Sequence, residues 1–196
     1  MSLGGATFPV PMDLDLLLPP ARRPGPPELP AFGDQLDRSL ARARARLPAV
    51  APGEVQVWIR RQPTLACVFR QSRPVVIHLH SVLNHKQTPP EVLEFILIHE
   101  LIHLAVPPRA VDGKLSSHPP EFWEFERRAA PERPVAWYWI WSMLWEVLRE
   151  DKQAETIWVK RTWKKLMVRE RWSMAEALSR FEEDQAFLGR LVEPLI

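Results

Sequence analysis

Residues 88–108 read TPPEVLEFILIHELIHLAVPP, and this stretch decides both the fold and the chemistry that the sequence predicts. Thr88 and Glu91 form a capping-box pattern, which predicts the first turn of a helix. The apolar run that follows is typical of a helix buried on most of its sides, and the two prolines at 107–108 end it. The sequence therefore predicts one long buried helix in the middle of the chain.

The second half of this helix carries the motif His99-Glu100-Leu101-Ile102-His103, in the form HExxH. Residues four positions apart lie on the same helix face, so His99 and His103 can bind one zinc ion. Zinc lowers the pKa of bound water, and Glu100, one step around the helix, would act as general base in the attack on a carbonyl. The alternative is a core helix with incidental histidines, whose ring nitrogens would then need other partners.

A catalytic zinc site needs a third protein ligand, which the sequence must supply after the helix. The candidates are Asp112, His118, Glu121, Glu124 and Glu126. His118 lies where a second helix is predicted to begin, and Phe122 and Trp123 could anchor that helix against the first. We expect residues 105–116 to form an irregular loop that returns the chain to the metal.

HELIHL, a loop and then HPPEFW resemble the pattern of the SprT-like zinc metallopeptidases, the family of SprT and Spartan, with the YgjP-like minimal zincins as near kin. The resemblance covers residues 31–150. It implies zinc ligation by His99, His103 and His118, with Glu100 as general base in a compact α+β zincin-like domain. It also implies cleavage of peptide bonds, with DNA-associated proteins as expected substrates. A glutamate ligand, Glu121, is the alternative to His118.

The residues before the motif predict one helix and three strands. Residues 34–47 have helical periodicity, and three short segments near 55–59, 65–69 and 75–80 alternate with period two. We expect a three-stranded antiparallel meander packed on the HExxH helix, with 75–80 as the edge strand that pairs with substrate, as zincins do. His78 and His80 share one face of that strand, either as polar surface residues or as a second metal site.

The outer parts of the chain differ in composition from the centre. Residues 1–30 hold eight of the 21 prolines, which predicts a disordered leader before a domain at 31–150. Residues 151–196 are predicted to form an all-helical extension. Between them, the aromatic stretch 135–148 predicts a buried helix, with a docking surface as the alternative.

Residues 160–172 read KRTWKKLMVRERW, with six basic residues and one acidic residue. Basic side chains neutralise phosphates and tryptophans stack on bases, so this segment is a candidate DNA contact, although a solvated helix face is the alternative. The predicted contact residues are Lys160, Arg161, Trp163, Lys164, Lys165, Arg169, Arg171 and Trp172.

Composition narrows the remaining choices. A net charge of +2 is too small to indicate a nucleic-acid or membrane partner for the whole chain. The single cysteine, Cys67, excludes an internal disulfide and a zinc ribbon and indicates a reducing compartment. With no membrane span or signal segment recognisable, we expect a cytoplasmic protein. Three hypotheses remain: a zinc metallopeptidase, a non-proteolytic zincin-shaped metal-binding module, and a DNA-associated interaction protein using 160–172.

Overall fold

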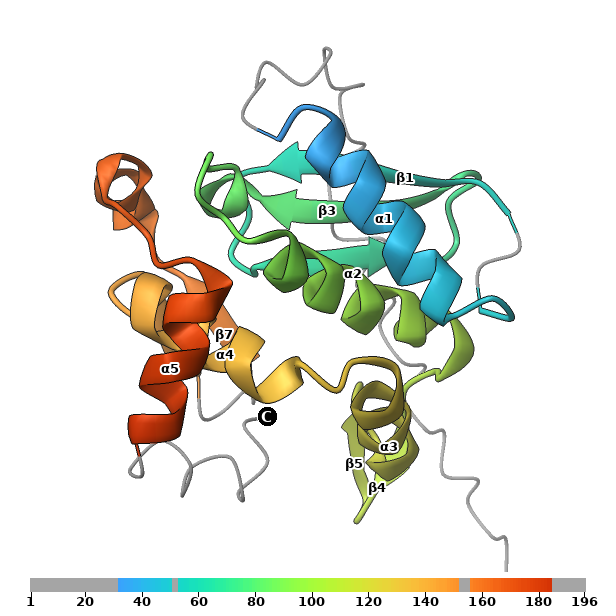
Figure 1. Ribbon diagram of the computed structural model, residues 1–196. Coiled ribbons are helices and arrows are strands. Elements are labelled where there is room, and N and C mark those ends of the chain that lie inside the picture. Colours follow the sequence, from blue (N-terminus) through green and yellow to red (C-terminus); the bar gives the residue numbers. More distant parts are fainter. Residues whose placement is uncertain (1–31, 51–52, 152–155, 185–196) are drawn as a thin grey trace, which may run out of the picture.

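The computed structural model describes residues 32–50, 53–151 and 156–184 (Figure 1). The predicted leader at 1–30 lies outside the described residues. The elements follow in the order α1 (Asp34–Arg46), β1 (Val55–Arg60), β2 (Ala66–Phe69), β3 (Val75–His80), η2 (Ser81–Leu83), α2 (Pro90–Ala105), β4 (Arg109–Val111), β5 (Lys114–Ser116), α3 (Pro120–Ala129), α4 (Arg133–Leu144), β6 (Leu148–Asp151), β7 (Thr156–Val159), η3 (Arg161–Val168) and α5 (Met174–Glu183). The fold is of mixed α+β type.

The first three strands form a mixed sheet in the order β1-β3-β2. β2 runs antiparallel to β3, as predicted, but β1 runs parallel to β3, with Val55 opposite Val75. The prediction of an all-antiparallel meander was therefore wrong. Period-two alternation identifies a strand but says nothing of which neighbour it pairs with or in which direction.

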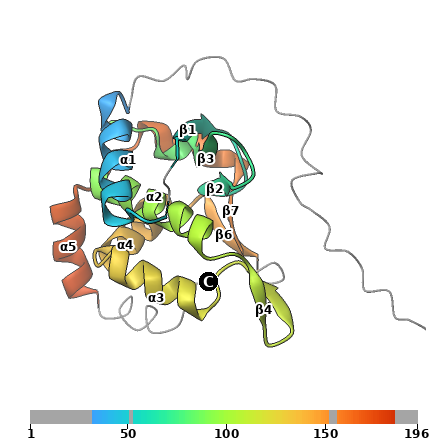
Figure 2. The same ribbon diagram turned by 90° about the vertical axis from the view of Figure 1, so that its right-hand side faces the viewer.

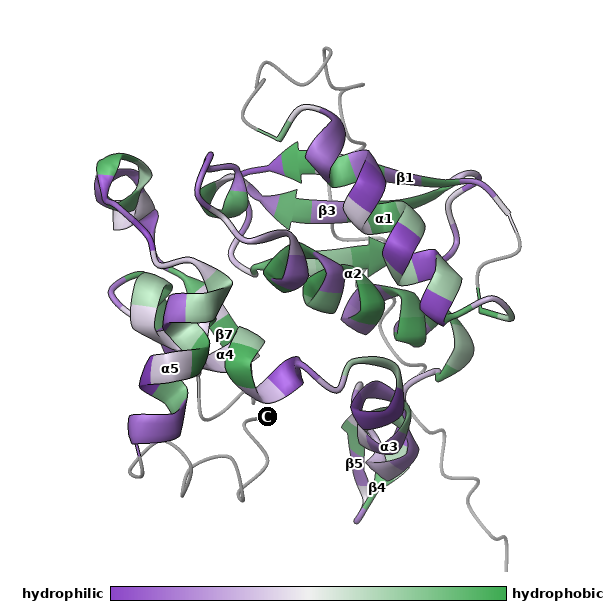
Figure 3. Ribbon diagram, viewed as in Figure 1, coloured by the Kyte–Doolittle hydropathy of each residue, from purple (hydrophilic) through white to green (hydrophobic). Residues whose placement is uncertain are grey.

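Helix α2 is the centre of the fold and contacts α1, β2, α3 and α4. Its residues from Val92 to Ile98 are all buried, which agrees with the apolar run in the sequence. Figure 3 shows the contrast between the largely hydrophobic α2 and the two-faced α1 beside it. The buried Glu94 is paired with α1, because Arg42 donates a hydrogen bond of 2.9 Å to its carboxylate.

The beginning of α2 differs in detail from the predicted capping box. The N-cap is Pro89, and no side chain caps this end of the helix. Thr88 instead donates its hydroxyl hydrogen bond to the carbonyl of Leu83 and accepts one from Arg171. A hydroxyl two positions before the helix can satisfy a tertiary partner instead of a helix N–H group.

The C-terminal part is not all helical, which corrects the prediction for 151–196. Leu148–Asp151 and Thr156–Val159 form an antiparallel hairpin across the predicted boundary. The β-branched residues at 156, 157 and 159 favour a strand, and tertiary pairing outweighs the helical pattern around them. Buried side chains on both sides of residue 150 join one hydrophobic cluster.

The aromatic helix α4 is buried, as predicted for 135–148, although it ends at Leu144. Trp139 is fully buried, and its indole N–H donates to the carbonyl of Trp172 at 2.8 Å. Trp145, one residue past the helix, is largely exposed. Within the described part of the chain, no helix has the length and hydropathy that crossing a membrane requires.

Candidate metal centre

Three histidine side chains converge at the C-terminal half of α2. His99 and His103 lie one helical turn apart, and His118 approaches them from the residues just before α3. The Nε2 atom of His118 lies 3.0 Å from Nε2 of His99 and 3.2 Å from Nε2 of His103. All three residues are partly buried, and among the described residues they form the one group of this kind that could hold a metal ion.

The spacing of these nitrogens fits a tetrahedral ion. Zn–N bonds of about 2.0–2.1 Å in tetrahedral geometry separate two nitrogen ligands by about 3.3 Å. The observed separations of 3.0 and 3.2 Å are close to that value. Three imidazoles and no thiolate form a donor set that suits zinc and leaves a fourth position for another ligand.

Two of the three imidazoles are held in the neutral form that binds metals. Burial, followed by the neighbouring His99, lowers the pKa of His103 to about 2 and that of His118 to about 3. Both rings therefore carry a free nitrogen lone pair at neutral pH. No proton has to be removed from these two residues before a metal ion binds.

His99 is oriented by a buried carboxylate. Its Nδ1 donates to Oε1 of Glu126 at 2.6 Å, and Nε of Arg133 donates to Oε2 of the same carboxylate at 2.5 Å. Burial opposes the charge on Glu126, but the hydrogen bond and charge of His99, with those of Arg133, lower its pKa. Burial alone would lower the pKa of His99, but the hydrogen bond to Glu126 and the negative charge of Glu126 outweigh this effect, so the pKa is raised. The arrangement fixes the ring so that Nε2 faces the other two histidines.

Glu126 was one of the predicted candidates for third ligand, and the structure gives it this supporting position. Its side chain is 0% exposed. The signal in the sequence is its place four residues after Phe122, which puts both side chains on the buried face of α3. No role for Arg133 was predicted from the sequence.

Aromatic side chains pack around the three imidazoles. The ring of Phe122, which is fully buried, lies 4.6 Å from the ring of His103 and 4.7 Å from that of His118. The ring of Trp123 lies 5.0 Å from that of His118. Contacts on several sides restrict rotation of the ligand rings, as expected from the predicted anchoring of α3.

Glu100 lies on α2 beside the sheet and is 5% exposed. Burial raises the pKa of its carboxyl to about 7, while His99 and a hydrogen bond from the backbone N–H of Val68 act in the opposite direction. A carboxyl group with a pKa near neutrality can both accept and release a proton at working pH.

The other predicted third ligands lie elsewhere. Glu121, the alternative to His118, pairs with Arg109 at 2.5 Å and is 40% exposed. Glu124 is exposed on α3, and Asp112 lies in the turn between β4 and β5. The carboxylates are not part of the histidine cluster.

The segment between the second and third histidines is a β-hairpin, which corrects the predicted irregular loop. β4 and β5 pair through Ala110 and Leu115, and the turn residues Asp112 and Gly113 have φ of 50° and 79°. Asp-Gly is a strong signal for such a two-residue turn, and the sequence contained it. Figure 2 shows the hairpin projecting from the body beyond the end of α2.

The strand expected to lie at the sheet edge is in fact central. β3 lies between β1 and β2, so its backbone is paired on both sides. The edge strand next to the metal centre is β2, which contacts α2 and whose Val68 binds Glu100. Among the residues that the structure describes, His78 and His80 join no group that could hold a metal. The ring of His78 stacks on Trp58, and Nδ1 of His80 accepts from the N–H of Val82.

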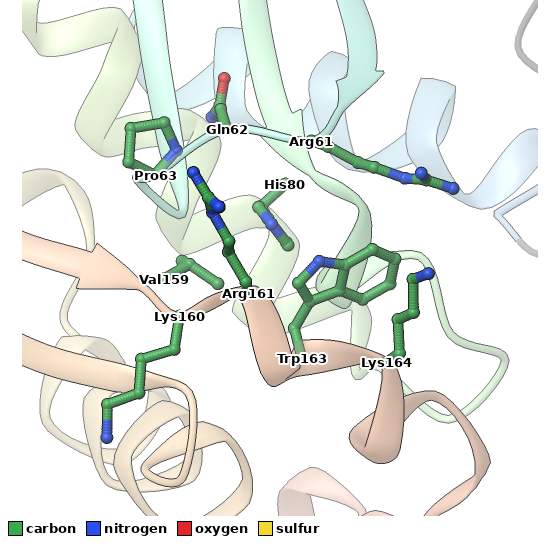
Figure 4. A pocket seen from close by; sticks show the side chains of 9 residues that line it. All are labelled: Arg61, Gln62, Pro63, His80, Val159, Lys160, Arg161, Trp163 and Lys164. Carbon is green, nitrogen blue, oxygen red and sulfur yellow. The ribbon is translucent and has the colours of Figure 1, made fainter.

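The structure divides the predicted DNA-contact residues. Arg171 is 7% exposed and donates to the carbonyl of Val82 at 2.8 Å, so it is a structural residue and not a surface contact. The ring of Trp172 lies under Arg180, 4.4 Å from its guanidinium carbon, and Arg169 is paired with Glu146. Lys165 is exposed. The remaining four line one pocket beside β3 (Figure 4): Lys160, Arg161, Trp163 and Lys164.

No family model, curated protein or solved structure matches the chain.

Proposed function

We propose that the protein is a zinc-dependent metallopeptidase of SprT-like type. The observation that carries the proposal is the convergence of three Nε2 atoms, two of them from an HExxH helix, at separations that fit one tetrahedral ion. His99, His103 and His118 would hold the zinc. When bound, zinc supplies Lewis acidity toward a substrate carbonyl and toward water.

The protein residues around the site would do the remaining work. Glu126 and Arg133 hold the ring of His99 in place. Glu100 would take a proton from the water that attacks the peptide carbonyl and pass it to the amine as the C–N bond breaks. The free edge of β2, next to Glu100, would pair with an extended peptide backbone. Proteins bound to DNA are the substrates that the resemblance favours.

The proposal is tested by separating metal binding from hydrolysis. Wild-type protein should bind one zinc ion per chain and cleave an unfolded protein such as casein. His99→Ala and His118→Ala should lose both properties. Glu100→Gln should keep the zinc and lose the cleavage, because the amide cannot take up a proton.

Glu121→Gln is the matched control, since Glu121 is an exposed carboxylate on the neighbouring helix. It should retain both zinc and cleavage. A wild-type protein that binds no zinc contradicts the proposal. A protein that binds zinc but cleaves neither unfolded nor DNA-bound substrates is the non-proteolytic metal-binding module instead.

A further inference from the structure

A second site of different chemistry lies where the C-terminal segment meets the sheet. A pocket of about 510 Å³ is formed by the β1–β2 connection, the end of β3 and the beginning of η3 (Figure 4). Its volume is within the range of small-molecule sites. Its lining residues are Arg61, Gln62, Pro63, His80, Val159, Lys160, Arg161, Trp163 and Lys164.

The walls of this basic pocket are held by hydrogen bonds between segments far apart in the sequence. The N–H of Val159 donates to the carbonyl of Pro63, which joins β7 to the β1–β2 connection. The N–H of His80 donates to the carbonyl of Leu65 at 2.7 Å. These bonds join the backbone segments that carry the lining side chains.

The pocket is strongly basic. Four of its lining residues are cationic and none is acidic. Within the described ranges 32–50, 53–151 and 156–184, no ion pair includes any of these four cations. The nearby Arg169, in contrast, is paired with Glu146. Cations that are not neutralised repel one another and attract an anion. A guanidinium group can donate two parallel hydrogen bonds to two oxygens of one phosphate.

Trp163 adds a flat aromatic wall to the basic pocket. The guanidinium carbon of Arg61 lies 5.6 Å from the centre of its ring, and the ring of His80 meets it edge-on at 5.3 Å. Figure 4 shows Arg161 and Trp163 rising from η3 with His80 between them. Burial, with Arg61 adding to the effect, lowers the pKa of His80 to about 4, so this ring is neutral at pH 7.

We infer that this pocket binds a nucleotide, with its phosphate on the cationic side chains of the lining and its base against Trp163. A phosphate satisfies the guanidinium groups, and a purine or pyrimidine ring stacks on an indole. The ligand is a free mononucleotide or one nucleotide unit of a single strand, since both present the same groups. The site is separate from the metal centre and does not depend on the proposed peptidase activity.

Isothermal titration of the full chain with adenosine 5′-monophosphate tests the inference. The nucleotide should bind at least tenfold more tightly than either adenosine, which lacks the phosphate, or ribose 5-phosphate, which lacks the base. Equal affinity for ribose 5-phosphate and the nucleotide overturns the assignment of Trp163. No binding of the mononucleotide or of an eight-residue oligothymidylate at millimolar concentration overturns the inference as a whole.

Matched variants test the location. Arg161→Gln and Arg61→Gln should each weaken nucleotide binding at least tenfold, whereas Lys165→Gln, which removes one charge from the same helix outside the pocket, should change it less than twofold. Equal losses in all three variants overturn the inference in favour of diffuse charge attraction. Glu100→Gln should bind the nucleotide as the wild type does, which keeps this test independent of catalysis.

The oligothymidylate distinguishes the two sources of the nucleotide. Tighter binding of the oligomer than of the mononucleotide, lost in Arg161→Gln, supports a single strand as the ligand. Tighter binding of the mononucleotide supports a free nucleotide.

Discussion

Glu126 shows how one buried side chain decides the geometry of a site. Its two carboxylate oxygens bind two different groups, His99 and Arg133, and the residue is not one of the three that converge on the candidate metal position. The sequence shows that Glu126 is present but does not show its role. A carboxylate that follows an HExxH motif can either bind the metal or orient a metal ligand, and only its position in the fold distinguishes the two. The same uncertainty applied to Glu121, which pairs with Arg109.

Replacement of Glu126 by glutamine should weaken zinc binding by 10–100-fold, the usual effect of losing a residue that orients a ligand. The amide keeps the size of the side chain but loses the charge that holds the Nδ1 proton of His99. Competition with a chromogenic chelator measures the affinity. The control is Glu121→Gln, which should bind zinc as the wild type does, and an equal loss in both variants would contradict the orienting role.

We expect His80 to make the stability of the fold sensitive to mild acid. Burial lowers its pKa to about 4 in the folded chain, against about 6.5 when unfolded. Between these values the unfolded state binds a proton that the folded state does not, so stability is present above pH 6.5 and is lost as the pH falls toward 4. Protonation of His80 in the unfolded state should lower the free energy of unfolding by at most about 1.4 kcal/mol per pH unit, or about 3 kcal/mol in total.

Urea unfolding at pH 7, 6 and 5, with zinc removed by a chelator, measures this effect. His80→Asn keeps an acceptor for the N–H of Val82 but cannot titrate. Its unfolding free energy should fall less steeply with decreasing pH than that of the wild type. Parallel pH profiles for the two proteins would assign the acid sensitivity to other groups.

Helix α2 was the element that the sequence predicted best, since its apolar run, its motif and its final prolines all agree with one another. The strands were found but their order was not. The alternation in Val55–Arg60 is the same whether the strand runs parallel or antiparallel to its neighbour. The β4–β5 hairpin was not predicted, although Asp112 and Gly113 form a typical two-residue hairpin turn. An irregular loop was expected there because the segment has to return the chain to the metal.

The central position of α2 makes its core side chains essential for stability. Leu97→Ala should lower the free energy of unfolding by about 2–5 kcal/mol, because the side chain is fully buried and leaves a cavity. Leu115→Ala, the same substitution at a site 73% exposed on β5, should change it by less than about 0.5 kcal/mol. Urea denaturation of the zinc-free proteins measures both, and similar values for the two would contradict the described burial.

Over the whole molecule, Arg171 joins the C-terminal segment to the main body. Its guanidinium donates to Thr88 and to the carbonyl of Val82, both in the connection before α2. Burial lowers its pKa to about 10, which leaves it charged at neutral pH. A run of basic residues in a sequence does not show which side chains are buried and which are exposed. Residues 160–172 contain both the cations that line the pocket and the buried Arg171.

Arg171→Ala should lower the free energy of unfolding by about 2–4 kcal/mol, because several buried acceptors lose their charged donor. Arg169→Ala, two residues earlier, breaks only an exposed pair with Glu146 and should cost less than about 1 kcal/mol. Chemical unfolding at pH 7 measures both. A C-terminal segment that is independent of the main body would give equally small changes for the two variants.

The β4–β5 hairpin lies between the second and third histidines, and its turn residues Asp112 and Gly113 are exposed. Exposed turns accept inserted peptides because no core contact depends on their length. A short peptide tag placed between these two residues would leave His99 and His103 on α2 and His118 in the residues before α3. The hairpin is thus a suitable place for a fluorescent reporter beside the histidine cluster that alters none of the three histidines.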